Sequence, residues 1–412
     1  FSLGMFGLAV LGKCNNLFVW VFFFILQLLS IPLWPEIFRT IRSLWYSEVQ
    51  EPVTIPQSVG MALAVIFAFL TLLFAFLPPM GFDALEYHLG VPWAYWQAGG
   101  MKFLPHLFFS NFPMNMEMLF TLAWRVAGET GIKVFHWSLS LVIALAVYRF
   151  LKARVTRSLA LLGMLLFLTD VQTVQLAIGD KIDLGLALFA FLAFEAFCVW
   201  LEEKKPGEAT LAGVFCGFAA GCKYTILGIL VAPMALLMLG VLIRNRLAVQ
   251  SPLSKENGSV RQVPPKGFLR FCLIVVVLFS PWAIRNWIYQ GNPVFPLAYS
   301  VFGGKTMDDE FNQFMKVTTD ATWPEELQKL KQLPSTEEQL RAALDILTQK
   351  EPLLRLFLPV ALAAIILGGG KSLRSLSLLL LLGWLVWIAL SRPIPRYLFP
   401  LYPGMVFLLV LV

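Results

Sequence analysis

The sequence has few charged residues for its length. Asp, Glu, Lys and Arg make up 14% of its 412 residues, whereas hydrophobic residues make up 58%, and the mean hydropathy is +0.74. Soluble globular domains carry roughly 25% charged residues. The composition therefore excludes a soluble domain and predicts a polytopic membrane protein.

Motifs for nucleotides and structural metals are also missing. The sequence contains no P-loop and no GxGxxG turn. Its five cysteines lie in or beside apolar segments without CxxC spacing, which predicts small core residues rather than disulfides or metal ligands. The net charge of +7 is typical of a membrane protein with basic cytoplasmic loops, so we expect no nucleic-acid partner.

Long apolar runs recur along the chain, each near the ~20 residues that a helix needs to cross a bilayer. The alternation typical of a β-barrel is missing. We therefore predict an all-α polytopic membrane protein with about eleven transmembrane helices, and an interfacial helix at 114–127. The expected crossings are 16–33, 57–78, 133–151, 159–174, 184–201, 209–221, 224–243, 267–284, 352–367, 376–390 and 397–412.

Loop charges predict the topology and the parts of the chain. Segment 244–266 has five basic residues and one acid, typical of a cytoplasmic loop, whereas 287–350 has six basic residues and nine acids. In the latter, Ser335 with Glu338 predicts a capping box and one amphipathic helix. We expect N-terminal helices and a connector (1–56), a core (57–285) with an external loop (79–132), a second external loop (286–351) and C-terminal helices (352–412). The start FSLGMFG and the apolar end FLLVLV indicate a longer natural protein.

A polar stretch, Gly81–Pro113, follows the apolar run that ends at Pro78. Ionisable groups at the edge of a bilayer are costly and usually face a cavity or another protein surface rather than lipid. The stretch therefore predicts a membrane-surface active site. Its ionisable residues are Asp83, Glu86, His88, Lys102 and His106.

The predicted topology places further polar clusters on the same external face. Asp180 and Asp183 are three residues apart and are expected to share one face of a helix. Arg285 with Asn286 forms another cluster, for which an interfacial arginine and a helix stop are the simpler interpretation. The last cluster is Arg392, Arg396 and Tyr397. Its arginines depart from the positive-inside tendency, which favours a functional role.

In this order, the motifs resemble those of the GT-C membrane glycosyltransferases, in the branch of the protein O-mannosyltransferases and lipid A aminoarabinose transferases. The resemblance covers Gln57–Val412. It depends on a loop with an acid followed by YH, an Asp at the outer start of a later crossing, GCKY at 221–224, PWAIRN at 281–286, GNPVFPL at 291–297 and RPIPRY at 392–397. The family often has adjacent loop acids, whereas here Glu86 stands three residues beyond Asp83.

The resemblance implies inverting transfer of a sugar from a polyprenyl-phosphate donor to an acceptor, among membrane lipids on the outer face of a bacterial inner membrane. Asp83 would be the general base, with Glu86 beside it, and Asp180 or Asp183 the second acid. No cofactor is required, and a divalent cation is compatible with the chemistry. The expected contacts to substrate or lipid phosphate are His88, Lys102, Arg392, Arg396 and Tyr397.

Simpler interpretations exist for several of these residues. Asp83 has the residue type and position of an N-cap for a helix beginning at Ala84. Nearby tryptophans and a tyrosine (Trp93, Tyr95, Trp96) are typical of interfacial anchors, although they are also suited to stack on a sugar. Glu86, His88 and His106 are a weak signal for a metal site, because the two histidines are far apart in sequence.

Two other classes of function remain open at this level. A transporter or flippase of lipid-linked substrates would also carry charged and aromatic groups in a cavity, usually with pseudo-symmetric halves that we do not detect. A noncatalytic subunit of a membrane complex would use the charged loop to dock a partner, without a need for acids and phosphate-type cations together.

Overall fold

The computed structural model describes residues 1–39, 42, 52–250, 265–306, 351–367, 370–390 and 394–412, with eight single positions between 333 and 348. Every regular element in these residues is helical, which confirms the predicted all-α fold. Two compact units can be distinguished: unit 1 contains 1–110 and 114–182, and unit 2 contains 111–113 and 183–412. The division at 182/183 falls inside the expected core, and the domain limits given above stay a prediction.

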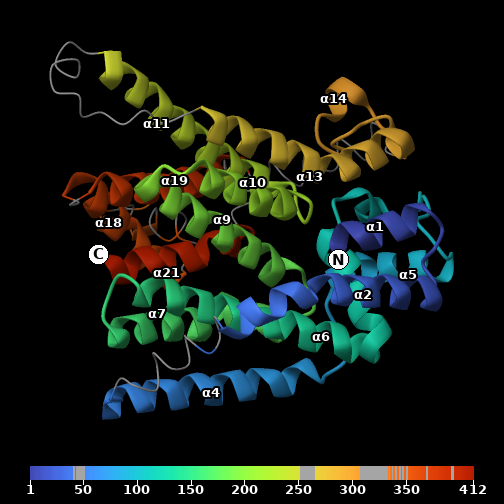
Figure 1. Ribbon diagram of the computed structural model, residues 1–412, viewed down its shortest axis with the longest axis horizontal. Coiled ribbons are helices and arrows are strands. Elements are labelled where there is room, and N and C mark those ends of the chain that lie inside the picture. The colour runs from blue at the N-terminus through green and yellow to red at the C-terminus, as the bar shows by residue number, and fades with distance from the viewer. Residues whose placement is uncertain are drawn as a thin grey trace. The chain divides into compact units, whose positions relative to one another are not determined.

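Unit 1 is built around three helices that pack side by side, α4, α6 and α7 (Figure 1). A capping box begins α4, where the Thr54 amide donates to Gln57 Oε1 at 3.1 Å. The elements of unit 1 are α1 (Ser2–Val10), α2 (Asn16–Ser30), η1 (Ile31–Leu33), α4 (Ile55–Ala75), η2 (Ala84–His88), α5 (Gly90–Gln97), α6 (Asn115–Lys152), α7 (Arg157–Thr169) and α8 (Val171–Ala177), while η3 (Phe108–Asn111) ends in unit 2.

Two breaks interrupt the helices of unit 1. In α6, Ala127 and Gly128 leave the helical conformation, and Gly128 has φ +60° and ψ −150°, a backbone conformation that suits glycine. This break separates the segment predicted at 114–127 from the crossing predicted at 133–151. The crossing predicted at 159–174 is bent by 60° between α7 and α8. Asp170 starts the second piece by accepting a hydrogen bond from the Thr173 amide at 3.1 Å.

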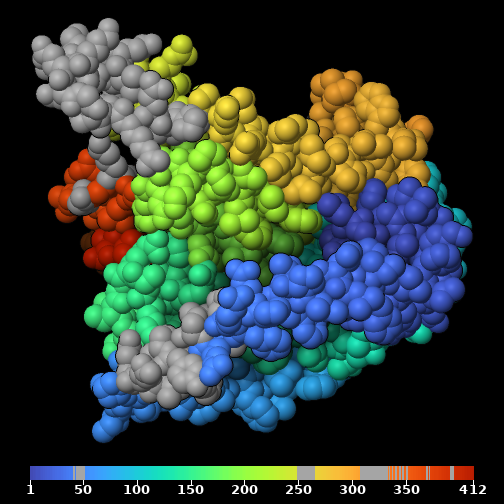
Figure 2. All heavy atoms as spheres, viewed as in Figure 1, coloured from blue at the N-terminus to red at the C-terminus, as the bar shows by residue number. Residues whose placement is uncertain are grey.

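Unit 2 places α10 against both α9 and α13 (Figures 1 and 2). Small residues let α10 and α13 approach closely: a Cβ on Gly213 would lie 2.9 Å from the backbone of Phe271, and one on Gly217 would lie 2.8 Å from Leu278. The elements of unit 2 are α9 (Asp183–Glu203), α10 (Pro206–Ala220), η4 (Leu227–Val231), α11 (Ala232–Gln250), α13 (Lys266–Gln290), α14 (Tyr299–Phe302), α18 (Pro352–Ile366), α19 (Lys371–Leu390), α20 (Pro395–Leu398), η5 (Phe399–Leu401) and α21 (Tyr402–Leu411).

Two local predictions in unit 2 have a clear outcome. Helix α13 continues through Asn286 to Gln290 and ends at Gly291, which has φ +72°. The interpretation of Asn286 as a helix stop was therefore wrong, and the glycine ends the helix because it tolerates the left-handed conformation. The expected cap at Ser335 is present, since its Oγ accepts from the Glu338 amide at 3.2 Å. The leucines expected on that amphipathic helix (Leu340, Leu344, Leu347) lie outside the described residues.

Within the described residues, seven helices are long and apolar enough to cross a membrane, or eight if α7 with α8 is one bent span. The chain is thus an integral membrane protein, but the predicted count of about eleven is not confirmed. Helices α10 and α18 have only 15 residues each, below the ~20 of a full crossing. The seven are 16–39, 55–75, 115–152, 183–203, 227–247, 266–290 and 372–389.

Candidate functional site

The first group of predicted site residues lies on and just before η2, a single π turn in unit 1. Asp83 has helical backbone angles, and its side chain makes no capping hydrogen bond, so the alternative of a simple N-cap loses its main support. Glu86 lies on the turn itself, and its Oε2 is buried without a hydrogen-bond partner among the described residues. Burial, and then the negative charge of Asp83, raise the pKa of Glu86. The structure therefore brings the two predicted acids close enough to interact.

His88, at the end of the same turn, is buried beside an acid that the sequence did not single out. Its Nδ1 lies 2.7 Å from Oε1 of Glu117, on the first turn of α6, and the two side chains are 5% and 2% exposed. A buried charge-assisted contact of this kind holds the turn against α6. This placement favours a structural role for His88 over the expected contact to a phosphate.

Asp180 lies next to the start of the acidic loop. Its Oδ1 is so close to Gly81 that a Cβ built on that glycine would be only 2.9 Å away. Asp180 itself is 5% exposed and precedes α9, which begins at Asp183. The expectation that Asp180 and Asp183 share a helix face was therefore wrong, because only Asp183 belongs to the helix.

The remaining ionisable residues of the loop are on the surface of unit 1. Lys102 and His106 are both exposed. In the described part of the chain, no group of three or more His, Cys, Asp and Glu side chains is arranged to hold a metal ion. Glu86, His88 and His106 consequently do not form the metal site for which the sequence gave a weak signal.

Lys223 organises the second group of site residues, in unit 2. Its Nζ donates to Asp183 Oδ1 at 3.1 Å and lies 4.4 Å from the ring centroid of Tyr397. The guanidinium carbon of Arg396 lies 5.4 Å from the same ring. Asp183 is 1% exposed. The structure thus brings Asp183, Arg396 and Tyr397 together around one lysine, whereas Arg392 lies outside the described residues.

A second polar network in unit 2 surrounds Arg285 on α13. Nε and Nη2 of Arg285 donate to Asn286 Oδ1 at 3.1 and 2.7 Å, and Nη2 also donates to the Phe112 carbonyl at 3.0 Å. Asn286 Nδ2 donates to the Asn111 carbonyl and the Tyr224 hydroxyl at 2.8 and 2.9 Å. Arg285 is only 4% exposed, so the interpretation as an ordinary interfacial arginine was wrong.

Sequence reasoning missed Glu117 and included Lys223 only as part of the motif GCKY at 221–224. Glu117 has a weak signal, an acid placed inside an apolar segment, which usually needs a partner. Lys223 follows Gly221 and Cys222, where the chain breaks between α10 and η4. Their partners are 29 and 40 residues away in sequence, so no local spacing identifies them.

Comparisons with known proteins give one structural likeness to report. No family model matches the chain, and no curated protein matches it. The fold is similar to that of ArnT from Cupriavidus metallidurans, solved as a crystal structure in the apo state, with a TM-score of 0.55 and 12% sequence identity. The likeness covers 86% of this chain and 58% of the ArnT chain, so this chain spans less than two thirds of that protein. At this identity the likeness shows the fold alone, an all-helical membrane fold similar to that of ArnT.

Proposed function

We propose that this chain is an integral-membrane glycosyltransferase that takes a sugar from a polyprenyl-phosphate donor and transfers it to an acceptor hydroxyl on the non-cytoplasmic side. The observation that carries the proposal is the cluster around Tyr397, where Lys223 and Arg396 approach one ring beside the buried Asp183. A lysine and an arginine gathered at one ring suit the binding of a phosphate. The likeness of the fold to ArnT supports the same class.

The residues of unit 1 supply the acid–base part of the proposed reaction. Asp83, as a carboxylate, accepts the proton of the acceptor hydroxyl, whose oxygen attacks the anomeric carbon. The bond from that carbon to the phosphate oxygen breaks, and its electron pair leaves with the polyprenyl phosphate, which gives inversion. Glu86 keeps its proton to higher pH than an ordinary glutamate. It is therefore suited to donate a hydrogen bond beside Asp83 rather than to compete for the proton.

Within unit 2, Lys223 and Arg396 are suited to stabilise a phosphate from which a sugar departs. Negative charge increases on the phosphate oxygen as the sugar leaves, and fixed cations stabilise that charge in a site with little water. Tyr397 keeps both cations beside one ring. The hydrogen bond from Lys223 to Asp183 fixes the lysine side chain in this position.

Purified full-length chain supplied with radiolabelled polyprenyl-phosphate sugars tests the proposal. Asp83→Asn is expected to abolish transfer, and Lys223→Met to raise the KM for the donor. Glu129→Gln, which changes an exposed acid on α6, is the control and should transfer like the parent. Undiminished transfer by Asp83→Asn would remove this residue from the mechanism. Absence of turnover with every donor would favour a noncatalytic subunit.

A specific observation favours the transporter as a second candidate. Discontinuous membrane helices are common at transporter binding sites, and α7 and α8 form a bent pair with a 60° angle at Asp170. Proteoliposomes that contain the chain and a fluorescent polyprenyl-phosphate sugar separate the two classes. A transporter moves the label between leaflets without an acceptor, whereas the proposed transferase does not.

A further inference from the structure

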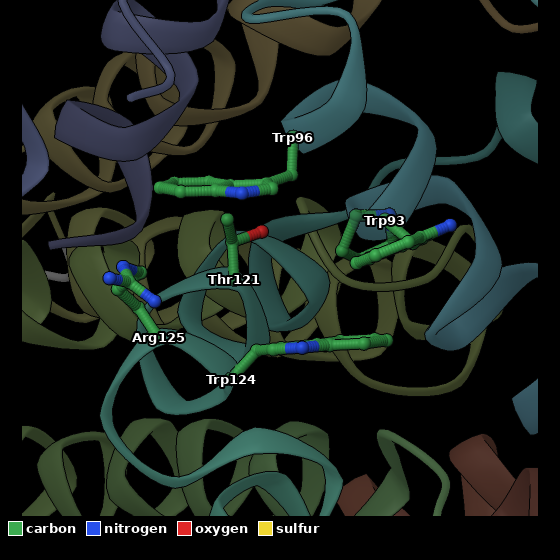
Figure 3. A pocket seen from close by; sticks show the side chains of 6 residues that line it. Trp93, Trp96, Thr121, Trp124 and Arg125 are labelled. Atoms are coloured by element: carbon green, nitrogen blue, oxygen red, sulfur yellow. The ribbon is translucent and has the colours of Figure 1, made fainter. Parts of the chain in front are cut away.

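A small pocket in unit 1 lies between α5 and the first half of α6, apart from the acids on η2. It has a volume of about 140 Å³ and is lined by three tryptophans, a proline, a threonine and an arginine (Figure 3). This volume is well above the ~10–15 Å³ that one water needs and below the ~300–1,000 Å³ of pockets for drug-sized ligands. The pocket therefore fits one ring-sized group. The lining residues are Pro92, Trp93, Trp96, Thr121, Trp124 and Arg125.

The indole rings give the pocket flat walls. Trp93 and Trp124 are stacked, with ring centroids 5.3 Å apart and an interplanar angle of 19°. Figure 3 shows Trp96 and Trp124 on opposite sides of the pocket, with Thr121 between their levels and Arg125 at one side. Aromatic faces carry partial negative charge and attract the weakly positive C–H groups of a ligand. A pyranose ring presents such C–H groups on its faces.

Arg125 adds a cationic hydrogen-bond donor to the pocket. Its guanidinium carbon lies 5.6 Å from the ring centroid of Trp96, and its Nε is buried without a hydrogen-bond acceptor among the described residues. A buried donor left without an acceptor destabilises the structure. An occupant that supplies an acceptor removes this destabilisation. The guanidinium group favours carboxylate and phosphate, which it binds through two parallel hydrogen bonds.

Interfacial anchoring alone does not account for this arrangement. Trp93 is 46% exposed, as expected of an anchor. Anchoring, however, needs neither a hollow between indole rings nor a buried arginine donor at its side. The combination of flat aromatic walls, one ring-sized volume and one cationic donor is typical of a site for a charged sugar.

We propose that the pocket formed by Trp93, Trp96, Thr121, Trp124 and Arg125 binds one pyranose unit that carries a phosphate or carboxylate group. The sugar ring lies against the indole faces, and the anionic group accepts hydrogen bonds from Arg125. The choice of a sugar phosphate as the ligand rests on the proposed function, whereas the binding itself requires no transfer.

Isothermal titration of the full chain in nanodiscs of neutral lipid tests this site, with glucose 1-phosphate, glucose and inorganic phosphate as separate probes. We expect glucose 1-phosphate to bind about tenfold or more tightly than either partial probe, because it uses both the aromatic walls and the arginine. Arg125→Gln should lose that tenfold advantage. Trp96→Ala should weaken binding of both sugars.

Matched variants keep the outcome interpretable. Arg154→Gln removes an arginine that also lies over an aromatic ring, Phe150, at 4.0 Å but does not line the pocket, so it should bind like the parent. Arg125→Lys keeps the charge without the fork and should bind with intermediate affinity, which tests the site even if the Gln variant does not fold.

Several results would overturn the assignment. They are equal binding by Arg125→Gln, equal binding of inorganic phosphate alone, and displacement of the sugar by vesicles of an anionic phospholipid, which would indicate a lipid-headgroup site. The proposed function fails separately. If Asp83→Asn binds glucose 1-phosphate normally while the parent shows no transfer, the pocket stands and the transferase does not.

Discussion

The close approach of α10 and α13 gives a sharp test of the packing in unit 2. Gly213→Ala adds one methyl group where a Cβ would lie 2.9 Å from both Cα and O of Phe271. Non-bonded carbon atoms prefer ~3.5–4.0 Å, so the two helices must separate by roughly 0.6–1 Å. Backbone atoms cannot rotate away as a side chain can. Overpacking of this kind costs about 1–3 kcal/mol.

Helix propensity acts in the opposite direction and has to be cancelled by a control. Alanine is favoured over glycine inside a helix by about 0.8–1.0 kcal/mol. Gly240→Ala on α11 gains the same propensity, but a Cβ there has nothing within 4 Å. The difference in unfolding free energy between Gly213→Ala and Gly240→Ala therefore isolates the steric term, and we expect it to be about 1–3 kcal/mol.

Thermal and denaturant unfolding of the two purified variants, followed by intrinsic tryptophan fluorescence in one detergent, measures this difference. Gly240→Ala should unfold at or above the parent midpoint, and Gly213→Ala below it. If both variants are stabilised equally, α10 and α13 do not approach as closely as described. The inference that glycine at 213 is required by the packing would then be wrong.

Three further outcomes are expected. Glu117→Gln should lower the unfolding free energy by roughly 1.5–3 kcal/mol, because it removes a buried charge-assisted contact, while Glu129→Gln on the surface should have little effect in the same assay. Arg285→Lys should destabilise unit 2 by about 1–2 kcal/mol, because lysine lacks the two guanidinium N–H groups that bind Asn286. Arg270→Lys, at an exposed site of the same helix, should have little effect when both variants are measured by denaturant unfolding. Because the pKa of Glu86 is raised, its protonated form is favoured in the fold, and the stability it contributes is lost as pH rises through that pKa. Glu86→Gln should therefore melt increasingly above the parent as pH rises above about 4, the ordinary range for a glutamate. A constant difference across that rise would contradict the assignment.

Composition and apolar run length were sufficient to predict the membrane class and the all-α fold. The break near Gly128 agrees with the prediction that 114–127 is an interfacial helix separate from the crossing at 133–151. Counted as a crossing of its own, 114–127 would have placed the basic residues at 149–157 on the external side. The bend at Asp170 was not recognised, although Asp is one of the residues preferred at the N-cap of a helix. A mean hydropathy taken over 159–174 hides its one charged residue, Asp170.

The candidate site was predictable only as separate pieces. Asp83 with Glu86, and Arg396 with Tyr397, are neighbours in sequence and were identified together. The long-range partners were not, because the fold alone brings Asn111 to Asn286 across 175 positions. A helix face or a loop spacing contains no information about such a contact. The pocket beside Arg125 escaped notice for the same reason, since its walls come from two elements.

Lys133 on α6 is 4% exposed, and its Nζ donates to the carbonyls of Leu77 and Phe74 at 2.6 and 3.3 Å. Phe74 lies in the last turn of α4 and Leu77 lies two residues beyond its end, where carbonyls no longer have the regular amide partners of a helix interior. The ammonium group thus tethers the last point of α4 before the chain enters the loop of Asp83. Movement of the second half of α6 along its axis would displace Lys133 together with the two carbonyls that it binds. A substitution far from Asp83 and Glu86 is therefore able to alter the position at which the loop begins. A hydrophobic residue in place of Lys133 would remove the hydrogen bonds that hold this end of α4.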